Sequence, residues 1–359
     1  MRIAIDIQTT AGQKTGFGFY VENLVSNLKK YDPKNEYILL KPKDIADLST
    51  PRRFVWDQFQ MPRLAKKAKV DLLHQPCFST PVFYSGKKVV TCHDLIAVFF
   101  PRNLPLASRL FFSKWMPYSY RKADMIIADS VNTKKDLMGI LKIPEDKIEV
   151  VYLAVSEKFH PNHEKKDIEK ALRRYKITQP YLLHVGTLEP RKNLEFLVKV
   201  FSKVVSSNPN FHLVITGKKG WYYKGLFNLV QKLNLDQKVI FTGYVQDEDL
   251  PYLYAGASVF VFPSLYEGFG LPPLEAMACG CPVVSSDTSS MPEVIGEGGI
   301  LLPLNDASLW IKAIGEILSK ENIASFYRQK GLQQARKFSW QKTALKTISI
   351  YEKIYQGAK

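Results

Sequence analysis

Short apolar runs alternate with helix-like segments along this chain, and the series occurs twice. The first half contains the runs RIAIDI, EYILLK, VDLLH, KVVTCHD, ADMIIADS and KIEVVYLAV, and the second contains PYLLHVG, FHLVITG, KVIFTG, SVFVFPS, PVVSS and GILL. Strands that alternate with helices form mostly parallel sheets, which helices cover on both faces. The sequence therefore predicts an α/β fold made of two tandem doubly wound, Rossmann-like domains.

A polar stretch from Glu157 to Lys170 separates the two series. A chain of 359 residues is long enough for each of two domains to bury its own core. We expect an N-terminal domain over residues 1–165 and a C-terminal domain over 166–338, followed by a last helix over 339–356 that Ser339 caps. Open α/β sheets bind ligands beyond the carboxyl ends of their strands, so a cleft between the domains is the expected ligand site.

Composition narrows the class of protein. The apolar fraction of 46% and the charged fraction of 23% are those of an ordinary globular protein. No apolar stretch approaches the roughly 20 residues that span a bilayer, and Asp6 interrupts the first apolar run, so we expect a cytoplasmic protein without a signal peptide. The four cysteines form no CxxC pair and are expected to be reduced. The net charge of +16 is spread over both halves, which argues against a nucleic-acid-binding arm and suits a phosphate-rich substrate or an anionic membrane.

Two glutamates bracket the segment EGFGLPPLE, which follows the run SVFVFPS. We expect Glu267 in the loop after a buried strand and Glu275 inside the next helix, whose first turn tolerates proline because its N–H groups are unpaired. Gly268 and Gly270 allow backbone N–H groups to approach a ligand, and a helix N-terminus attracts phosphate. Carboxylates beside a phosphate-binding loop suit a sugar nucleotide, although the same pattern taken alone also fits a plain loop with a solvated helix.

The segment GTLEPRKN, which begins at Gly186, is a second candidate phosphate site. Arg191 and Lys192 precede the helix-like segment NLEFLVKVFSKVV and are expected at its N-terminus. Cations at that end of a helix oppose its dipole unless an anion binds there, and with a bound diphosphate the cations and the dipole act together. We therefore interpret Gly186, Arg191 and Lys192 as parts of a diphosphate-binding loop.

Two further motifs follow strands of the first half. His93 directly follows the run KVVTC at the end of a predicted strand. A lone histidine in such a place is more often structural than catalytic. Gly16 and Gly18 lie in TGFGFY, where we expect a flexible loop that closes on the donor phosphate. Val21 stands where a nicotinamide-binding fingerprint needs its third glycine, which argues against such a site.

The triplet Asp247-Glu248-Asp249 has the DxD spacing of some metal-dependent transferases. It immediately precedes the segment LPYLYAGA, and acidic residues favour a helix N-terminus. We therefore predict a helix start at this triplet and no metal site.

The chain resembles the retaining glycosyltransferases of family 4 along nearly its whole length. The matching segments, in the family's order, are TGFGFYVENL, VVTCHDL, HVGTLEPRKNL, EGFGLPPLE and FSWQKTA. Two glutamates separated by seven residues are the family's hallmark, and Glu267 and Glu275 match it. The resemblance implies the GT-B fold, retention of configuration, and a last helix that returns to the N-terminal domain.

The resemblance also implies roles for particular residues. Glu275 would bind the ribose hydroxyls of the donor, Glu267 would face the hexose or the reacting centre, and His93 would face the donor sugar. Many family members carry arginine directly after the glycine of the second motif, whereas this chain has Thr187, which leaves more of the diphosphate's charge to Arg191. Backbone N–H groups that would contact sugar and phosphate belong to Phe269, Gly270 and Leu271.

We therefore expect a retaining, metal-independent hexosyltransferase without a cofactor. Its donor would be a nucleoside diphosphate sugar of the GDP-mannose or UDP-glucose type. Its acceptor would be a hydroxyl group of a carbohydrate or lipid-linked precursor in polysaccharide or glycolipid biosynthesis. Two alternatives stay open at this point: a non-catalytic sugar-nucleotide-binding protein, and a phosphorylase of similar fold that uses pyridoxal phosphate, for which the chain is short.

The segment from Phe99 to Lys122 interleaves aromatic and basic residues. Interfacial membrane helices have this composition, so we expect peripheral contact with an anionic membrane, at the inner face of the bilayer. A core helix with a solvated basic face fits the same pattern. The residues concerned are Arg109, Phe111, Phe112, Lys114, Trp115, Tyr118, Arg121 and Lys122.

Overall fold

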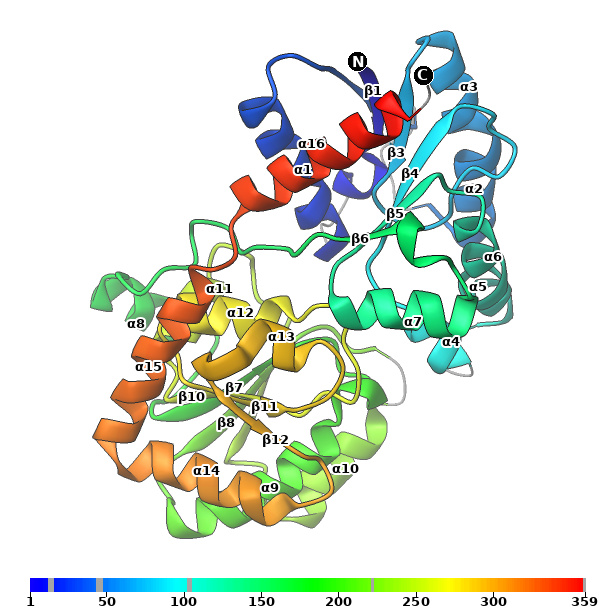
Figure 1. Cartoon of the computed structure of the whole chain (residues 1–359). Coiled ribbons are helices and arrows are strands. Elements are labelled where there is room, and N and C mark those ends of the chain that lie inside the picture. Colours follow the sequence, from blue (N-terminus) through cyan, green and yellow to red (C-terminus); the bar gives the residue numbers. More distant parts are fainter. Residues whose placement is uncertain (12–15, 43–47, 102–104, 221–222, 358–359) are drawn as a thin grey trace. The chain divides into compact units, whose positions relative to one another are not determined.

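The computed structural model describes residues 1–11, 16–42, 48–101, 105–220 and 223–357. The chain forms two compact units, of which the N-terminal unit comprises Met1–Ala154 with Ser339–Lys359 and the C-terminal unit comprises Val155–Phe338 (Figure 1). The change of unit comes earlier than residue 165 because part of the polar stretch packs within the C-terminal unit. There the ring of Phe159 lies 6.0 Å from that of Tyr254.

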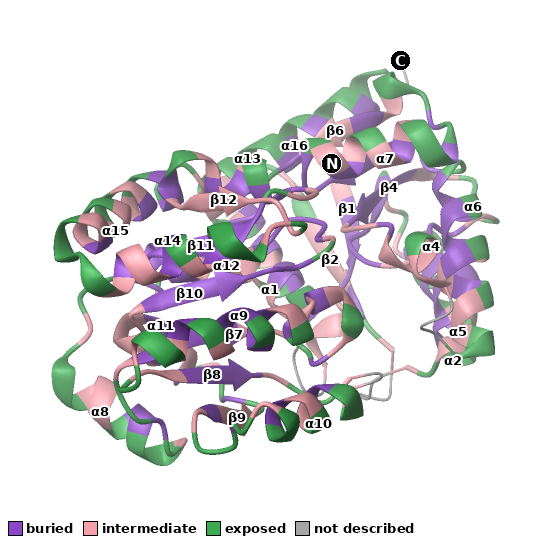
Figure 2. Ribbon diagram, turned by 90° about the horizontal axis from the view of Figure 1, so that it is seen from below, coloured by how far each residue is buried: buried purple, intermediate pink, exposed green. Residues whose placement is uncertain are grey.

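The N-terminal unit is built on a parallel six-stranded sheet of order β2-β1-β3-β4-β5-β6. The inner strands β3, β4 and β5 are buried along nearly their whole length, as expected when helices cover both faces, and Figure 2 shows this for β4. The strands are β1 (Arg2–Asp6), β2 (Glu36–Leu40), β3 (Leu72–Gln75), β4 (Lys87–Cys92), β5 (Met125–Ala128) and β6 (Ile148–Val150).

The last helix of the chain, α16 (Trp340–Gln356), packs against α1 (Gly16–Tyr31) in the N-terminal unit (Figure 1). The Ser339 side chain caps it by accepting the N–H of Lys342, and Tyr351 on its buried face shares a 2.6 Å hydrogen bond with His74 Nδ1. The other helices of this unit are α2 (Thr50–Val55), α3 (Met61–Lys67), α4 (Ile96–Phe99), α5 (Leu106–Leu110), α6 (Met116–Tyr120) and α7 (Val131–Leu141). Two π-helical turns, η2 (Trp56–Gln60) and η4 (Phe111–Trp115), join α2 to α3 and α5 to α6, and 3-10 turns occur at η1 (Gln8–Thr10) and η5 (Glu145–Lys147).

A second parallel six-stranded sheet, of order β12-β11-β10-β7-β8-β9, forms the C-terminal unit. Its central strands β7 and β10 are almost fully buried (Figure 2). The strand order reverses between them, which is where doubly wound sheets bind ligands. The strands are β7 (Tyr181–Val185), β8 (His212–Thr216), β9 (Val239–Gly243), β10 (Val259–Phe262), β11 (Val283–Ser286) and β12 (Ile300–Leu302).

Helices of the C-terminal unit cover both faces of this sheet. One face carries α9 (Leu194–Ser207), α10 (Lys224–Lys232) and α14 (Ala307–Ser319), which share an apolar core with the strands through Phe201, Leu226 and Trp310. The remaining helices are α8 (Lys165–Arg174), α11 (Leu250–Gly256), α12 (Leu271–Ala278), α13 (Met291–Ile295) and α15 (Glu321–Ala335), with 3-10 turns at η6 (Pro190–Lys192) and η7 (Gly296–Gly298).

All twelve apolar runs form strands, so the prediction of two doubly wound α/β units is confirmed. The expected loop at TGFGFY is wrong in part, because Gly16 and Gly18 lie in the first turn of α1. The helix-forming run after them extends back through both glycines, and residues 12–15 lie outside the described part of the chain. Across the described residues, no helix combines the length and the apolar character that crossing a bilayer requires.

Candidate active site

Two loops meet at the carboxyl ends of the central strands of the C-terminal unit. Strands β7 and β10 are neighbours, with Leu183 opposite Phe260. The segment GTLEPRKN follows β7, and the segment EGFG follows β10 and leads into α12. Both candidate motifs of this half therefore reach the same edge of the sheet, at its topological switch point.

Glu267, Arg191 and Lys192 form one buried ionic cluster at this edge. Lys192 Nζ lies 2.6 Å from Glu267 Oε1, and Arg191 Nη1 lies 2.7 Å from the same oxygen. The Ser264 hydroxyl donates a further hydrogen bond to it. Side-chain exposure is 8% for Lys192, 12% for Arg191 and 11% for Glu267, so the charges interact in a poorly hydrated environment.

The protonation states of this cluster follow from its contacts. Burial alone would raise the pKa of Glu267, but the charges of Lys192 and Arg191 and the hydrogen bonds from Lys192 and Ser264 lower it to about 2. Burial lowers the pKa of Lys192, and the neighbouring Arg191 adds to this effect while Glu267 opposes it. Glu267 thus faces both cations, and Arg191 also pairs with Glu189, so an incoming anion would share these cations with the two carboxylates.

The loop geometry explains why Arg191 and Lys192 converge on one carboxylate. Both residues belong to the short turn η6, which ends at Asn193 in a left-handed conformation with φ of 54° before α9 begins. Arg191 also donates to the Tyr266 carbonyl at 2.7 Å and pairs with Glu189 at 2.6 Å, so it ties the two loops together. A Cβ atom on Gly186 would lie 3.2 Å from Lys192 Cε, so this glycine leaves room for the lysine side chain.

The start of α12 presents backbone N–H groups beside the cluster. Gly270 precedes the helix with φ of 114°, a conformation that favours glycine, and Leu271 is its first residue. The Ser290 hydroxyl donates to the carbonyls of Glu267 and Phe269, at 3.0 and 2.6 Å, and fixes this turn. The helix N-terminus is therefore held in place next to Arg191 and Lys192, and its N–H groups and dipole favour an anion there.

Glu275 lies inside α12, as the sequence predicts, and its environment differs from that of Glu267. The Tyr254 hydroxyl donates to Glu275 Oε2 at 2.8 Å. Burial raises the pKa of Glu275 to about 7, and the hydrogen bond from Tyr254 and the charge of Lys158 only partly oppose this rise. The pKa values of the two glutamates therefore differ: Glu267 is ionised, and Glu275 titrates near neutral pH.

His184 is a residue near the site that sequence reasoning missed. It is fully buried on β7, shares a 3.0 Å hydrogen bond from Nδ1 with the Val261 carbonyl, and stacks on Phe262 at 5.5 Å. Burial lowers its pKa to about 3, so the ring is neutral. The only signal in the sequence was a polar residue inside an apolar run, which more often marks a satisfied core histidine.

His93 lies in the N-terminal unit, directly after β4. Its Nδ1 is 2.6 Å from Asp129 Oδ2, and its Nε2 is 2.9 Å from the Pro76 carbonyl oxygen. Burial opposes its charge, but the charge and hydrogen bond of Asp129, with a contact to Cys77, raise the pKa of His93 well above its usual range. Two acceptors on the two nitrogens require both to carry hydrogen, so His93 is a fixed imidazolium rather than a free base.

The DxD triplet stands at a helix start, as predicted. Asp249 is the residue before α11, and its carboxylate accepts hydrogen bonds from Arg174 and from the Tyr175 hydroxyl. Asp247 pairs with Lys158. Both carboxylates are therefore engaged by cations of the same unit.

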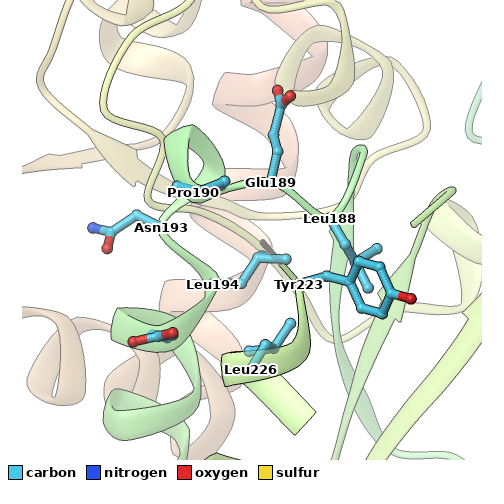
Figure 3. A pocket seen from close by; sticks show the side chains of 8 residues that line it. Leu188, Glu189, Pro190, Asn193, Leu194, Tyr223 and Leu226 are labelled. Atoms are coloured by element: carbon cyan, nitrogen blue, oxygen red, sulfur yellow. The ribbon is translucent and has the colours of Figure 1, made fainter. Parts of the chain in front are cut away.

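Residues of the loop after β7, among them Leu188, Pro190 and Asn193, line a pocket of about 220 Å³. Leu194, Leu226 and Tyr223 gather at it, while the carboxylate of Glu189 points away from them (Figure 3). Ligand pockets usually measure about 300–1,000 Å³, so this one is too small for a whole sugar nucleotide. It does not include Arg191, Lys192 or Glu267.

Two family models and several curated relatives match this chain, and all of them are glycosyltransferases. The model for glycosyl transferases group 1 matches residues 165–335, and the model for glycosyltransferase family 4 matches residues 23–159. The O-antigen chain mannosyltransferase B of Escherichia coli is 33% identical over 84% of this chain and 77% of its own length. The serotype-specific mannosyltransferase WbdA of the same organism is 31% identical over 76% of this chain, which spans only 34% of that longer protein.

Solved structures of low identity share the fold. A sucrose-phosphate synthase from Thermosynechococcus elongatus superimposes with a TM-score of 0.78 at 22% identity, covering 99% of this chain and all of that one. The lipopolysaccharide glycosyltransferase WaaG superimposes with a TM-score of 0.74 at 13% identity, covering 97% of this chain and 99% of that one. These likenesses establish the GT-B fold, and the family models with the mannosyltransferase relative establish the family. The chain therefore belongs to glycosyltransferase family 4 and is a hexosyltransferase.

Proposed function

We propose that this enzyme transfers a hexose, with retention and without a metal ion, from a nucleoside diphosphate sugar to a hydroxyl acceptor. The observation that carries the proposal is the buried cluster of Arg191, Lys192 and Glu267 beside the N-terminus of α12. We favour mannose as the hexose because the relatives of about 30% identity are named mannosyltransferases. Anabaena Alr3699/HepE, a structural neighbour of 17% identity, has been solved in complex with UDP and glucose, so a UDP-hexose is the second candidate.

Arg191 and Lys192 would bind the diphosphate and stabilise it as it leaves. Negative charge on the leaving diphosphate grows toward the transition state, and fixed cations in a poorly hydrated site stabilise it without reorganising. Before the donor binds, the carboxylate of Glu267 occupies the position between the two cations. Donor binding would therefore share the cations between the carboxylate and the diphosphate, leaving Glu267 ionised and close to the hexose.

The remaining residues have supporting roles in this proposal. The N–H groups of Phe269, Gly270 and Leu271 would contact sugar and phosphate, and Gly186 would leave space for Lys192. In the N-terminal unit, the helix start at Gly16 and Gly18 would present N–H groups to the donor phosphate, and His93 would act on the donor hexose as a fixed cation, because its protonated form excludes a general-base role. The N-terminal unit would bind the acceptor, and the C-terminal unit would bind the donor.

The acceptor is proposed to be lipid-linked or polysaccharide, in O-antigen-like glycan synthesis. A relative of 29% identity from Campylobacter jejuni is named for transfer to a diphospho-undecaprenol-linked sugar. An enzyme with such an acceptor would work as a peripheral protein at the cytoplasmic face of the membrane.

Glu275 is proposed to accept hydrogen bonds from the ribose hydroxyls, and this makes donor binding depend on pH. The carboxylate accepts such bonds more strongly than the acid, and the pKa of Glu275 is raised to about 7. Affinity for the donor should therefore rise as the pH increases from about 6 to about 8, where the group loses its proton. Calorimetric titrations of donor across this range should show the rise in wild type.

Two variants sharpen this test. Glu275→Gln should bind donor weakly at every pH, and Tyr254→Phe should move the transition to higher pH because it removes a hydrogen bond that stabilises the carboxylate. A wild-type affinity that is flat with pH, or an unchanged profile in Glu275→Gln, would refute the role given to Glu275.

The stereochemistry and metal independence can be measured together. We expect the protein, supplied with GDP-mannose or UDP-glucose in buffer with EDTA and methanol, to release nucleoside diphosphate and form a methyl α-glycoside. Methanol traps the anomeric centre, so proton NMR reads its configuration directly. A methyl β-glycoside would show inversion, and activity that vanishes with EDTA and returns with manganese would show a metal requirement.

A further inference from the structure

Two helical segments of the N-terminal unit expose apolar and basic side chains on the same stripe. In the segment formed by α2, η2 and α3, a set of exposed apolar and basic positions recurs every three or four residues, and a similar set lies along the segment formed by α5, η4 and α6. Soluble helices normally bury the apolar stripe and expose a polar one. The exposed apolar and basic positions at this spacing are Arg52, Val55, Phe59, Arg63 and Lys66 in the first segment, and Leu106, Leu110, Lys114, Tyr118 and Arg121 in the second; Leu64 and Lys67 are exposed next to them.

The two segments lie side by side and form one surface. Thr50 and Ser108 share a hydrogen bond at 3.1 Å, and the ring of Phe54 lies 5.1 Å from that of Trp115 (Figures 1 and 2 show α2 beside α5). Phe83, from the loop after β3, stacks on Phe59 at 6.0 Å and extends the surface. Leu106, Phe83 and Leu110 are 68%, 67% and 58% exposed, which makes them the most exposed large apolar side chains among the described residues.

The charge of this surface is of one sign. From Thr50 to Val70 the only acidic residue is Asp57, which is fully buried, and from Phe99 to Lys122 there is none. No described carboxylate pairs with Arg63, Lys66 or Lys114. Cations that rim exposed apolar side chains without acidic partners are complementary to an anionic surface with an apolar interior.

We propose that this two-helix surface, and not the segment 99–122 alone, docks the enzyme on an anionic lipid bilayer. The exposed leucines and phenylalanines enter the boundary between headgroups and acyl chains, and the lysines and arginines meet the lipid phosphates. Each cation near an anionic leaflet adds roughly a five-fold gain in partitioning, within a Debye length of the surface. The core-helix alternative holds for one face only: Met116 and Tyr120 belong to the apolar core, whereas Leu106, Leu110 and Tyr118 are exposed.

This inference rests on the membrane location proposed above for the enzyme. Its test is independent of transferase activity, because binding to vesicles is measured without any substrate. We expect the wild type to co-sediment with vesicles that contain phosphatidylglycerol, to bind pure phosphatidylcholine vesicles weakly, and to be released by salt. The variant carrying Arg63→Gln, Lys66→Gln, Lys67→Gln and Lys114→Gln should lose binding by about 100-fold or more. The double variant Leu106→Ser with Leu110→Ser should also bind more weakly while keeping its response to salt.

Matched controls place the same changes elsewhere on the molecule. The exposed lysines 170, 199, 203 and 232 of the C-terminal unit, changed together to glutamine, lower the net charge equally and should leave binding nearly intact. Leu309→Ser with Leu345→Ser is the apolar control. All variants should release nucleoside diphosphate from the donor at the wild-type rate without vesicles, so loss of membrane binding is separate from loss of transferase activity.

Three results would overturn the surface assignment. The first is wild-type binding that does not depend on the anionic lipid content of the vesicles. The second is a loss of binding in the control variants equal to that in the surface variants. The third is a wild-type dimer that Leu106→Ser with Leu110→Ser dissociates while vesicle binding stays unchanged. The last result would show that a second copy of the chain covers this face.

Discussion

Lys192→Ala is expected to lower turnover by about 10²–10³-fold, equivalent to roughly 3–4 kcal/mol of barrier. The ammonium group is buried beside the proposed diphosphate position, so its charge acts on the leaving group with little screening. Glu267 keeps two other partners in this variant, Arg191 and Ser264, so the fold should survive. Single-turnover kinetics at saturating donor, with circular dichroism for folding, separate these two effects.

The matched control is Lys199→Ala, an exposed lysine on α9 of the same unit. It should retain wild-type turnover. Arg191→Ala should also lose turnover, with a larger loss of stability, because Arg191 additionally ties the Tyr266 carbonyl and Glu189 together. Near-normal turnover in both Lys192→Ala and Arg191→Ala would place the diphosphate elsewhere.

Glu267→Gln is expected to lower turnover by at least about 100-fold while the protein still binds nucleoside diphosphate. The amide keeps the shape of the side chain but removes the negative charge near the reacting hexose. It also removes the carboxylate paired with the buried Lys192 and leaves Arg191 with Glu189 alone, and breaking a buried pair costs on the order of 3–5 kcal/mol of folding free energy. Chemical denaturation should therefore show a clear loss of stability in the free variant, which added nucleoside diphosphate partly restores.

A Ser264→Ala variant is the companion measurement. It removes one neutral hydrogen bond to the same oxygen of Glu267 and leaves both ion pairs in place. We expect a small effect on turnover and on stability. A loss as large as that of Glu267→Gln would mean that the geometry of the loop, and not the charge of the carboxylate, limits the reaction.

The sequence predicted every strand, because each strand is a short apolar run, and the inner strands such as β3, β5 and β10 are buried along their whole length. It did not predict the order of strands in the sheets, and the side-chain pairs at the strand ends depend on that order. Cys92 lies opposite Ala128 in the parallel pair β4 and β5, so the next residues, His93 and Asp129, come side by side. Since β4 and β5 are distant in sequence, the pairing that fixes the charge of His93 could not be foreseen.

The same reasoning applies to the cluster in the C-terminal unit. The motifs predicted that Arg191, Lys192 and Glu267 serve one ligand, but not that they pair with each other. Their contact follows from the pairing of β7 with β10 in the sheet. In the sequence, 73 residues and two other strands, β8 and β9, lie between Val185 at the end of β7 and Val259 at the start of β10. Similarly, the raised pKa of Glu275 depends on burial against Tyr254, which spacing alone does not reveal.

Local signals misled at two points. The glycines of TGFGFY suggested a loop, yet the amphipathic run after them is long enough to extend the helix through Gly16. The second point is the membrane surface. The aromatic and basic pattern of residues 99–122 is visible in the sequence, but in α2, η2 and α3 buried residues such as Trp56 and Asp57 alternate with the exposed ones, so the exposed stripe cannot be recognised there. Only the fold separates the outward positions from the buried ones.

The most direct test of the proposed diphosphate site is a calorimetric titration of GDP and of UDP into wild type, Lys192→Ala and Glu267→Gln. In this account Arg191 and Lys192 bind the diphosphate, and Glu267 occupies the position between them before the nucleotide binds. The two substitutions should therefore change affinity in opposite directions. Lys192→Ala should weaken binding of the preferred nucleotide by about ten-fold or more, since one charge-assisted contact is lost. Glu267→Gln should bind it at least as tightly as wild type, because the competing carboxylate is gone. Unchanged affinity in Lys192→Ala together with weaker binding in Glu267→Gln would contradict the account.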